Sequence, residues 1–269
     1  RYELVKTMRA SILVLGSLVA RYGFARIALP GGCAIGTRPV DFHLEALQQL
    51  GAKIELKNGY IEASAKKLTG CEINFSGISV TGTENIMMAA VLAEGQTILR
   101  NVAKEPEVED LADFLNSMGA KVTGAGTDEI IIDGVKELHG SVFSIPADRI
   151  EAGTYLIAAA VTGGDITISN GQASRMNNIL DKLKLSGCLI NIEENAIQLT
   201  IDQDRISPVN ISTAPFPGFP TDMQAQFTVL NALSKGSSVV TENVFENRFM
   251  HVQELNRMGC DITVKGSNA

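Results

Sequence analysis

One short pattern that occurs four times constrains the fold of this 269-residue chain more than any other feature of its sequence. In each copy an amphipathic helix ends on a glycine and a strand follows. The glycines are Gly51, Gly119, Gly187 and Gly259, which lie 68, 68 and 72 residues apart. Glycine ends a helix because it adopts the left-handed conformation at little cost. A nearly constant spacing therefore predicts a supersecondary unit that is repeated along the chain.

The repeat predicts one order of elements in every copy, namely an apolar helix, a short strand, a loop, an amphipathic helix and a hairpin. The apolar helices are expected at residues 11–20, 86–93, 155–161 and 227–233. They are apolar on nearly all sides, so we expect other elements to wrap them, with the sheets outside and the helices inside. Lys57-Asn58-Gly59-Tyr60 predicts a type I′ turn in the first hairpin.

Composition indicates an ordered globular protein, because 45% of the residues are hydrophobic and the length suits about two domains. A formal net charge of -7 argues against nucleic acid as the main partner. No apolar stretch is long enough to span a membrane. The four cysteines and three histidines have no metal-site spacing, so we expect no metal, no disulfide framework and a cytoplasmic location.

The loop of residues 30–41 is the strongest candidate for a functional site. It combines three glycines with the thiol of Cys33 and the guanidinium of Arg38, which fits a carboxylate or phosphate. From strand to helix-ending glycine the first copy spans 24 residues, against 21, 21 and 20 in the others, and the extra residues fall in this loop. Such loops are more often functional than structural, although a solvent loop with an incidental thiol fits the sequence equally well.

The other cysteines have a simpler interpretation. Cys188 and Cys260 directly follow helix-ending glycines, where the first two copies have Ala52 and Ala120. We interpret them as small buried residues without chemistry.

Seven strings, in the same order throughout the chain, carry a resemblance to a known family. One of them is Pro30-Gly-Gly-Cys-Ala-Ile-Gly-Thr-Arg-Pro-Val-Asp-Phe42, and the others occupy residues 4–11, 80–85, 105–107, 148–153, 219–226 and 245–251. The sequence strongly resembles the enolpyruvyl transferases of the EPSP synthase family that act on UDP-N-acetylglucosamine. The resemblance implies an inside-out α/β barrel of two domains, each built from three repeated units.

The resemblance also implies how this chain divides. Four of the six units are present, residues 1–145 belong to the first domain and residues 146–269 to the second, with a hinge near residues 144–147. The chain opens on Arg1 and stops where the fourth hairpin is expected to turn, which leaves that strand without its partner. We therefore expect an internal portion of a longer protein.

The reaction implied by the resemblance transfers the enolpyruvyl group of phosphoenolpyruvate to the 3-hydroxyl of UDP-N-acetylglucosamine and releases phosphate, which opens peptidoglycan precursor synthesis. No cofactor is implied. In the family pattern Cys33 is the general acid, open to the epoxide fosfomycin, and Asp222 is the general base. The residues alone favour other roles, a nucleophile for Cys33 and an N-cap for Asp222, which precedes an apolar run.

The same pattern assigns the substrate-binding residues. Arg9, Arg38 and Arg248 match arginines that bind phosphate and carboxylate groups or line the cleft. The nucleotide sugar is assigned to Arg38, Pro39, Val40, Asp41 and Phe42 at uridine, to Ser79, Val80 and Thr81 at the diphosphate, and to Val244.

Some features depart from the family pattern. Gly77 stands where some members carry lysine, and Phe42 is bulkier than the usual aliphatic residue. A Lys-Asn pair and two further arginines of the family have no position in this chain, so we expect residues 1–269 alone to turn over little substrate.

Two alternatives remain open. One is the sister enzyme that acts on shikimate 3-phosphate, which shares the fold and the chemistry. The other is a non-catalytic paralogue that binds a nucleotide sugar and senses it.

Overall fold

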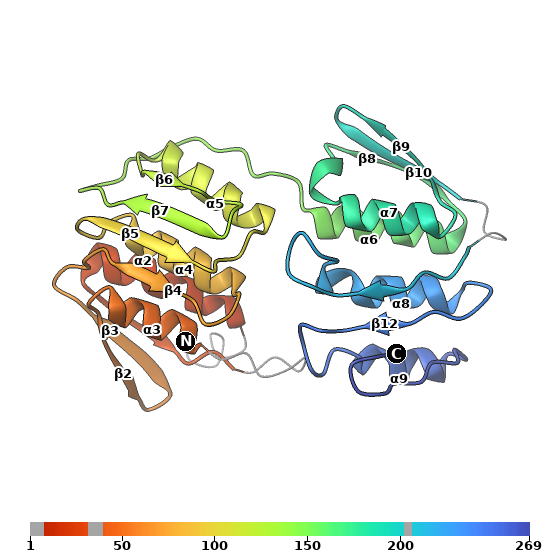
Figure 1. Cartoon of the computed structure of the whole chain (residues 1–269), viewed down its shortest axis with the longest axis horizontal. Helices are drawn as coiled ribbons and strands as arrows, with labels where there is room; N and C mark the ends of the chain where they lie inside the picture. Colours follow the sequence, from red (N-terminus) through yellow and green to blue (C-terminus); the bar gives the residue numbers. More distant parts are fainter. Residues whose placement is uncertain (1–7, 32–39, 202–205) are drawn as a thin grey trace. The chain divides into compact units, whose positions relative to one another are not determined.

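The chain forms two compact units that divide between Ile145 and Pro146 (Figure 1). Each unit has its own hydrophobic core. The computed structural model describes residues 8–31, 40–201 and 206–269. The first unit contains η1 (Arg9–Leu13), α2 (Val14–Tyr22), β1 (Phe24–Ala28), α3 (Asp41–Gln49), β2 (Lys53–Lys57), β3 (Tyr60–Ser64), β4 (Glu72–Asn74), α4 (Val80–Ala90), β5 (Gln96–Arg100), α5 (Pro106–Ser117), β6 (Val122–Thr123) and β7 (Glu129–Asp133).

The second unit begins with a helix and has fewer residues in strands. It contains α6 (Arg149–Thr162), β8 (Asp165–Ser169), η2 (Ala173–Arg175), α7 (Asn177–Leu185), β9 (Leu189–Glu193), β10 (Ala196–Thr200), β11 (Ile211–Ser212), η4 (Thr221–Met223), α8 (Gln224–Ala232), β12 (Val240–Thr241) and α9 (Met250–Arg257). Every helix among these described residues is too short or too polar to cross a bilayer.

The helix-ending turn predicted at the four glycines is confirmed. Gly51, Gly119, Gly187 and Gly259 have φ values of 96, 96, 100 and 100°. At the first of them the amide of Ala52 donates to the carbonyl of Leu47, and Gly51 donates to Gln48, the paired bonds of a Schellman motif. The same two bonds recur at the other three glycines, with Cys188 and Cys260 in the place of Ala52. Both cysteines therefore occupy the predicted position, but only Cys188 is buried as predicted, because Cys260 is partly exposed.

The strands repeat one arrangement as well. A first strand pairs antiparallel with the second strand of the following hairpin, which gives the orders β1-β3-β2, β5-β7-β6 and β8-β10-β9. The strands β4 and β11 add to β5 and β12 in parallel. In the first hairpin Lys57 pairs with Tyr60, and Asn58 and Gly59 have φ values of 51 and 78°. The type I′ turn is therefore confirmed.

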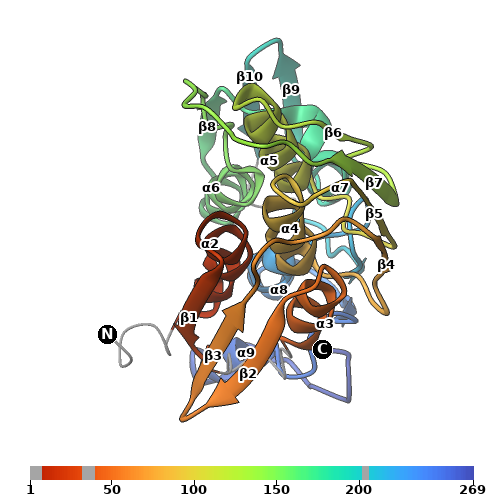
Figure 2. The same cartoon turned by 90° about the vertical axis from the view of Figure 1, so that its left-hand side faces the viewer.

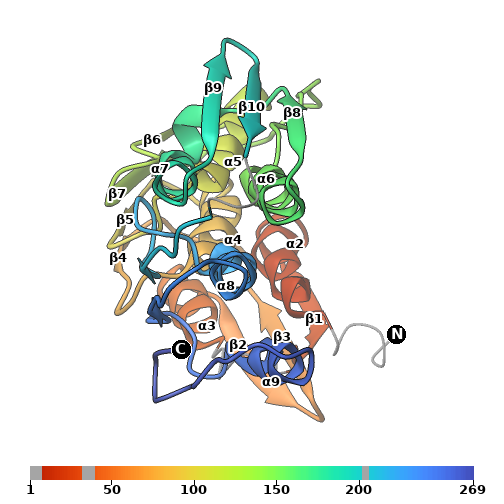
Figure 3. The same cartoon turned by 90° about the vertical axis from the view of Figure 1, so that its right-hand side faces the viewer.

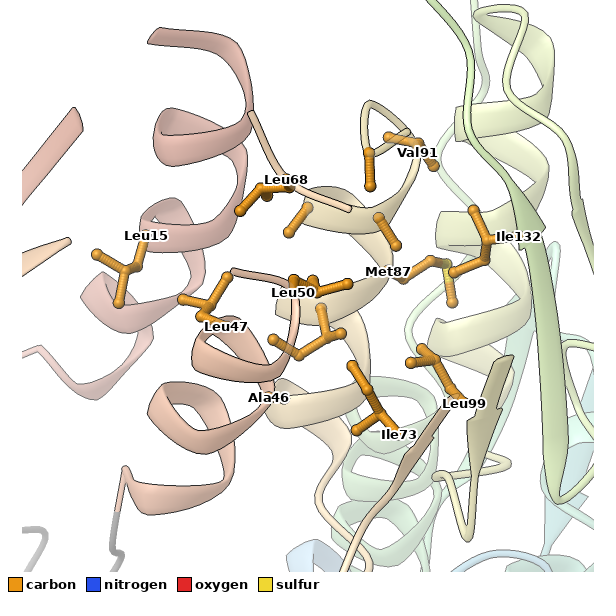
Figure 4. Close-up of a cluster of buried hydrophobic side chains, with 14 of the residues drawn as sticks. Leu15, Ala46, Leu47, Leu50, Leu68, Ile73, Met87, Val91, Leu99 and Ile132 are labelled. Carbon is orange, nitrogen blue, oxygen red and sulfur yellow. The ribbon is translucent and has the colours of Figure 1, made fainter. Parts of the chain in front are cut away.

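Helix α4 is the centre of the first unit, where it packs against α2, α3 and α5 (Figure 2). Leu15 from α2, Leu47 from α3 and Met87 from α4 meet in its core, and none of the three is exposed (Figure 4). Gly16 allows α2 to approach α4 closely, because a Cβ at this position would lie 2.4 Å from the carbonyl oxygen of Asn85 in α4. In the second unit α6 and α7 lie against the sheet of β8, β10 and β9 (Figure 3).

Two expectations about this packing are wrong for the described residues. The apolar helices are expected to be covered on all sides, which holds for residues 86–93, where no residue is exposed. In the fourth of them Leu233 is 56% exposed. Val14 in α2 and Tyr155 in α6 are instead 46% and 54% exposed. The strand expected after Gly259 is also not formed, because residues 261–264 belong to no strand, whereas Ala269, beyond the turn at Gly266, exchanges two backbone hydrogen bonds with Val240 of β12. This pairing repeats the position of β3 beside β1.

Candidate active site

The structure describes ten of the thirteen predicted site residues. Cys33, Arg38 and Pro39 lie outside the described residues. The first unit carries Arg9, Val40, Asp41, Phe42, Ser79, Val80 and Thr81, and the second carries Asp222, Val244 and Arg248.

In the first unit the predicted residues gather at the beginnings of three helices. Arg9 begins η1, which continues into α2. Val40 is the N-cap residue of α3, and Asp41 places its carboxylate in the first turn, where the helix dipole favours a negative charge. Ser79 is the N-cap of α4 and accepts a hydrogen bond of 3.1 Å from the amide of Gly82. Of these three helix starts, only that of α4 has a side-chain capping hydrogen bond.

Phe42 and Gly77, the two departures from the family pattern, lie against each other. A Cβ built on Gly77 would be 3.2 Å from Cζ of Phe42, which is closer than most real contacts of a Cβ. The phenylalanine ring therefore fills space that a side chain at position 77 would need.

A chain of hydrogen bonds connects α2 to the start of α4 through His43, which is 1% exposed. The amide of Gly16 lies 2.8 Å from Oδ1 of Asn85, and Nδ2 of Asn85 lies 3.0 Å from Nδ1 of His43. Nε2 of His43 lies 3.5 Å from the hydroxyl of Thr81. Burial, together with the nearby charge of Arg9, lowers the pKa of His43 to about 4, so the imidazole is neutral at pH 7.

In the second unit, Asp222 does not cap a helix. It lies inside η4, and the N-cap residues of η4 and α8 are Pro220 and Met223, neither of which makes a side-chain capping bond. The N-cap interpretation of Asp222 is therefore wrong. Its Oδ1 accepts a hydrogen bond of 2.6 Å from Nη2 of Arg248 instead.

Arg248 connects two residues of the η4 turn. Its Nη1 donates to the hydroxyl of Thr221 at 2.9 Å, while its Nη2 reaches Asp222. The guanidinium also lies 5.3 Å from the ring centroid of Phe245, within range of a cation–π contact. The side chain of Arg248 is 20% exposed and that of Asp222 is 59% exposed. The guanidinium of Arg248 is therefore fixed by its hydrogen bonds, whereas the carboxylate of Asp222 is accessible to solvent or substrate.

A buried carboxylate, Glu242, accepts hydrogen bonds from the residues around the Arg248–Asp222 pair and is only 3% exposed. Its Oε1 accepts from the hydroxyl of Thr213 and from the amides of Val244 and Phe245, at 2.8–3.1 Å. Its Oε2 accepts from the hydroxyl of Thr221 at 2.9 Å. The hydroxyl proton of Thr221 is thus directed to Glu242, which leaves its lone pairs for Arg248.

The sequence interpretation did not include Glu242, Thr221, His43 or Asn85. A signal existed for three of them, because Thr221 and Asn85 belong to family-like strings and His43 directly follows one. Glu242 lies just before the string that starts at Phe245 and carried no signal of burial. Among the described residues no group of histidine, cysteine or acidic side chains is arranged to hold a metal ion.

Comparison with known proteins identifies the family. The sequence profile named EPSP synthase (3-phosphoshikimate 1-carboxyvinyltransferase) matches residues 1–268. The chain belongs to the EPSP synthase family. The resemblance inferred from the seven strings is therefore confirmed.

Curated relatives of this family member are similar over its whole length. UDP-N-acetylglucosamine 1-carboxyvinyltransferases of Coxiella burnetii (strain Dugway 5J108-111) and Aeromonas hydrophila subsp. hydrophila are each 57% identical over 269 residues. The chain covers 62% of the first and 64% of the second, so it spans somewhat less than two thirds of their length.

Solved structures support the same mixed α/β fold. The enolpyruvyl transferase NikO from Streptomyces tendae matches 100% of the chain with a TM-score of 0.86 at 22% identity, and the chain covers 64% of that protein. An EPSP synthase from Acinetobacter baumannii matches 97% of the chain with a TM-score of 0.68 at 18% identity, and 62% of that protein is covered.

Proposed function

We propose that this chain belongs to an enzyme that transfers the enolpyruvyl group of phosphoenolpyruvate to the 3-hydroxyl of UDP-N-acetylglucosamine and releases phosphate. The observation that carries the proposal is the 57% identity, over all 269 residues, to enzymes named for this reaction. The Arg248–Asp222 pair supports it, because a carboxylate held beside a guanidinium suits proton transfer next to an anionic substrate.

The proposed catalytic roles of the residues are as follows. The sugar oxygen attacks C2 of phosphoenolpyruvate, Asp222 takes the hydroxyl proton, and the thiol of Cys33 donates a proton to the methylene carbon. Elimination then removes a proton from the new methyl group and breaks the bond from C2 to the phosphate oxygen. Arg248 engages Oδ1 of Asp222, so we assign Oδ2 to the hydroxyl proton.

Anion and nucleotide binding fall to the remaining residues. Arg9, Arg38 and Arg248 hold the phosphate and carboxylate of phosphoenolpyruvate. Residues 38–42 bind uridine, Ser79, Val80 and Thr81 bind the diphosphate, and Val244 contacts the sugar. The position of Ser79 and Thr81 at the start of α4 supports the diphosphate assignment, because a helix N-terminus favours negative charge.

We further propose that the two units, residues 1–145 and 146–269, belong to the two domains of an inside-out α/β barrel, and that they contribute four of its six units. The strand order shared by three copies and the central position of α4 support this proposal. A cytoplasmic location follows from the same reaction, and the free thiols of Cys71, Cys188 and Cys260 suit a reducing compartment.

Phosphate release by the product of the complete reading frame tests the function. We expect release with phosphoenolpyruvate and UDP-N-acetylglucosamine, and none when shikimate 3-phosphate replaces the nucleotide sugar. If phosphate is released from phosphoenolpyruvate with shikimate 3-phosphate but not with UDP-N-acetylglucosamine, the protein has the activity of the sister enzyme. Binding of UDP-N-acetylglucosamine without turnover, with fosfomycin labelling Cys71 rather than Cys33 in mass spectra, would indicate a sensor.

A further inference from the structure

The hydrogen bonds around His43 have directions that the geometry fixes. The backbone amide of Gly16 can only donate, so the atom of Asn85 that faces it at 2.8 Å must be the oxygen. The amide nitrogen of Asn85 therefore faces Nδ1 of His43 at 3.0 Å and donates to it. Asn85 has no exposed surface, so solvent does not compete for these contacts.

The next bond follows from the protonation state of His43. A neutral imidazole carries one proton, and Nδ1 is an acceptor, so the proton is on Nε2. Burial keeps the ring neutral, as its lowered pKa of about 4 also indicates. Nε2 is 3.5 Å from Oγ1 of Thr81 and can only donate to it. All three bonds thus run in one direction, from α2 toward Thr81.

We propose that His43 is a positioning residue that makes the hydroxyl of Thr81 a hydrogen-bond donor toward a phosphate group of the bound nucleotide sugar. Within the described residues the Thr81 hydroxyl makes no other hydrogen bond, and the side chain is half-buried near the start of α4. Since its oxygen accepts from His43, its proton points elsewhere, and an acceptor suits that position. The phosphate assignment rests on the proposed function, whereas the direction of the bonds does not.

The arrangement strengthens the donor, because each bond in a chain of this kind polarises the next. It also contributes to selectivity, since a ligand that presents an N–H or O–H to Thr81 would meet a second donor. His43 does not need to touch the ligand for this effect. The neutral Thr81–His43 pair offers an anion a fixed donor at a position two residues after the Ser79 cap.

The tautomer of His43 can be measured without any ligand. In long-range ¹H–¹⁵N spectra of the ¹⁵N-labelled product of the complete reading frame, we expect a neutral ring with its proton on Nε2 at pH 6 and at pH 8. A proton on Nδ1, or a charged ring at pH 6, would overturn the proposal. The exposed His139 provides the internal comparison in the same spectra.

Ligand affinity tests whether the hydrogen bonds through His43 and Thr81 extend to a phosphate group of the ligand. We expect Thr81→Val and His43→Phe each to weaken binding of UDP-N-acetylglucosamine about tenfold, as for loss of a hydrogen bond to a charged group. Binding of uridine, which has no phosphate, should change less than about twofold. The double variant should also lose about tenfold rather than a hundredfold, because both changes remove the same contact.

Matched controls separate this effect from a general loss of structure. His139→Phe and Thr123→Val change exposed residues of the same unit and should leave both affinities unchanged. If His43→Phe does not fold, His43→Gln keeps a donor in reach of Thr81 and should bind UDP-N-acetylglucosamine within about threefold of wild type. Equal losses for uridine and the nucleotide sugar, or additive losses in the double variant, would contradict the proposal.

The two proposals fail differently. Failure of the wild-type protein to bind UDP-N-acetylglucosamine would contradict the proposed function and the phosphate assignment of Thr81. The tautomer measurement would still support or refute the one-directional chain at His43.

Discussion

Arg248 and Asp222, 26 residues apart in the sequence, are joined by a hydrogen bond of 2.6 Å from Nη2 to Oδ1. The second guanidinium nitrogen donates to Thr221, which in turn donates to the buried carboxylate of Glu242. A planar fork with two fixed partners loses little freedom when a substrate anion arrives. The pair therefore places a preorganised guanidinium beside a solvent-accessible carboxylate on the second unit.

Replacing Arg248 by lysine keeps the charge but removes the fork. A lysine cannot donate to Thr221 and Asp222 in the same geometry, so we expect kcat/KM to fall about 10- to 100-fold. Steady-state phosphate release by the complete protein provides the measurement. Arg257→Lys is the control, because the Arg257 side chain is 77% exposed and, within the part of the chain that the structure describes, its ion pair is with the exposed Glu254 on the same helix. Equal activity of R248K and R257K would show that the fork is not needed.

Replacing Glu242 by glutamine should destabilise the second unit. The change places an amide where donors converge from Thr213, Thr221 and two backbone amides, so at least one buried donor loses its acceptor. We expect the free energy of unfolding to fall by about 1–3 kcal/mol in urea titrations. Glu254→Gln, at an exposed position of α9, should change it by less than about 0.5 kcal/mol. A neutral effect of E242Q would mean that the carboxylate is dispensable.

Glu84 makes stability depend on pH. Burial, and then the charges of Glu107 and Glu105, raise the pKa of Glu84 from 4.5 to about 7. The folded state therefore binds a proton that the unfolded state has lost, and this contribution to stability disappears as the pH rises from 4.5 to 7. We expect Glu84→Gln to be more stable than wild type at pH 8, by up to about 3 kcal/mol, and no more stable at pH 4.5.

The measurement for Glu84 is urea unfolding at the two pH values. Glu45→Gln, on the exposed side of α3, serves as the control and should not alter the pH dependence. An advantage of E84Q that is the same at both pH values would refute the ionisation of Glu84 as the cause.

The features that the sequence predicted depend on local geometry. A helix that ends on Gly51 or Gly187 needs a left-handed residue at one position, and glycine meets that need wherever the helix lies in the fold. The turn at Asn58 and Gly59 is local for the same reason. These requirements are visible in a few consecutive residues, so the order of helices and strands could be inferred.

The features that the sequence did not predict depend on distant partners. Glu242 is buried because Thr213 and Thr221, 29 and 21 residues away, supply its donors. Asp222 stands where a capping residue would be expected, yet its partner is Arg248. The exposure of Tyr155 likewise depends on which elements pack beside α6. The hydrophobic pattern of that helix does not indicate which elements these are.

The most direct test of the central claim is the turnover and binding of Asp222→Asn in the complete protein, with Asp261→Asn as an exposed control. Asparagine keeps the shape and a bond to Arg248 but cannot accept the sugar proton. We predict that D222N loses 10²- to 10⁴-fold in kcat, about the contribution of a general base, while its Kd for UDP-N-acetylglucosamine changes less than about threefold. Wild-type kcat in D222N would contradict the assignment of Asp222 as the base.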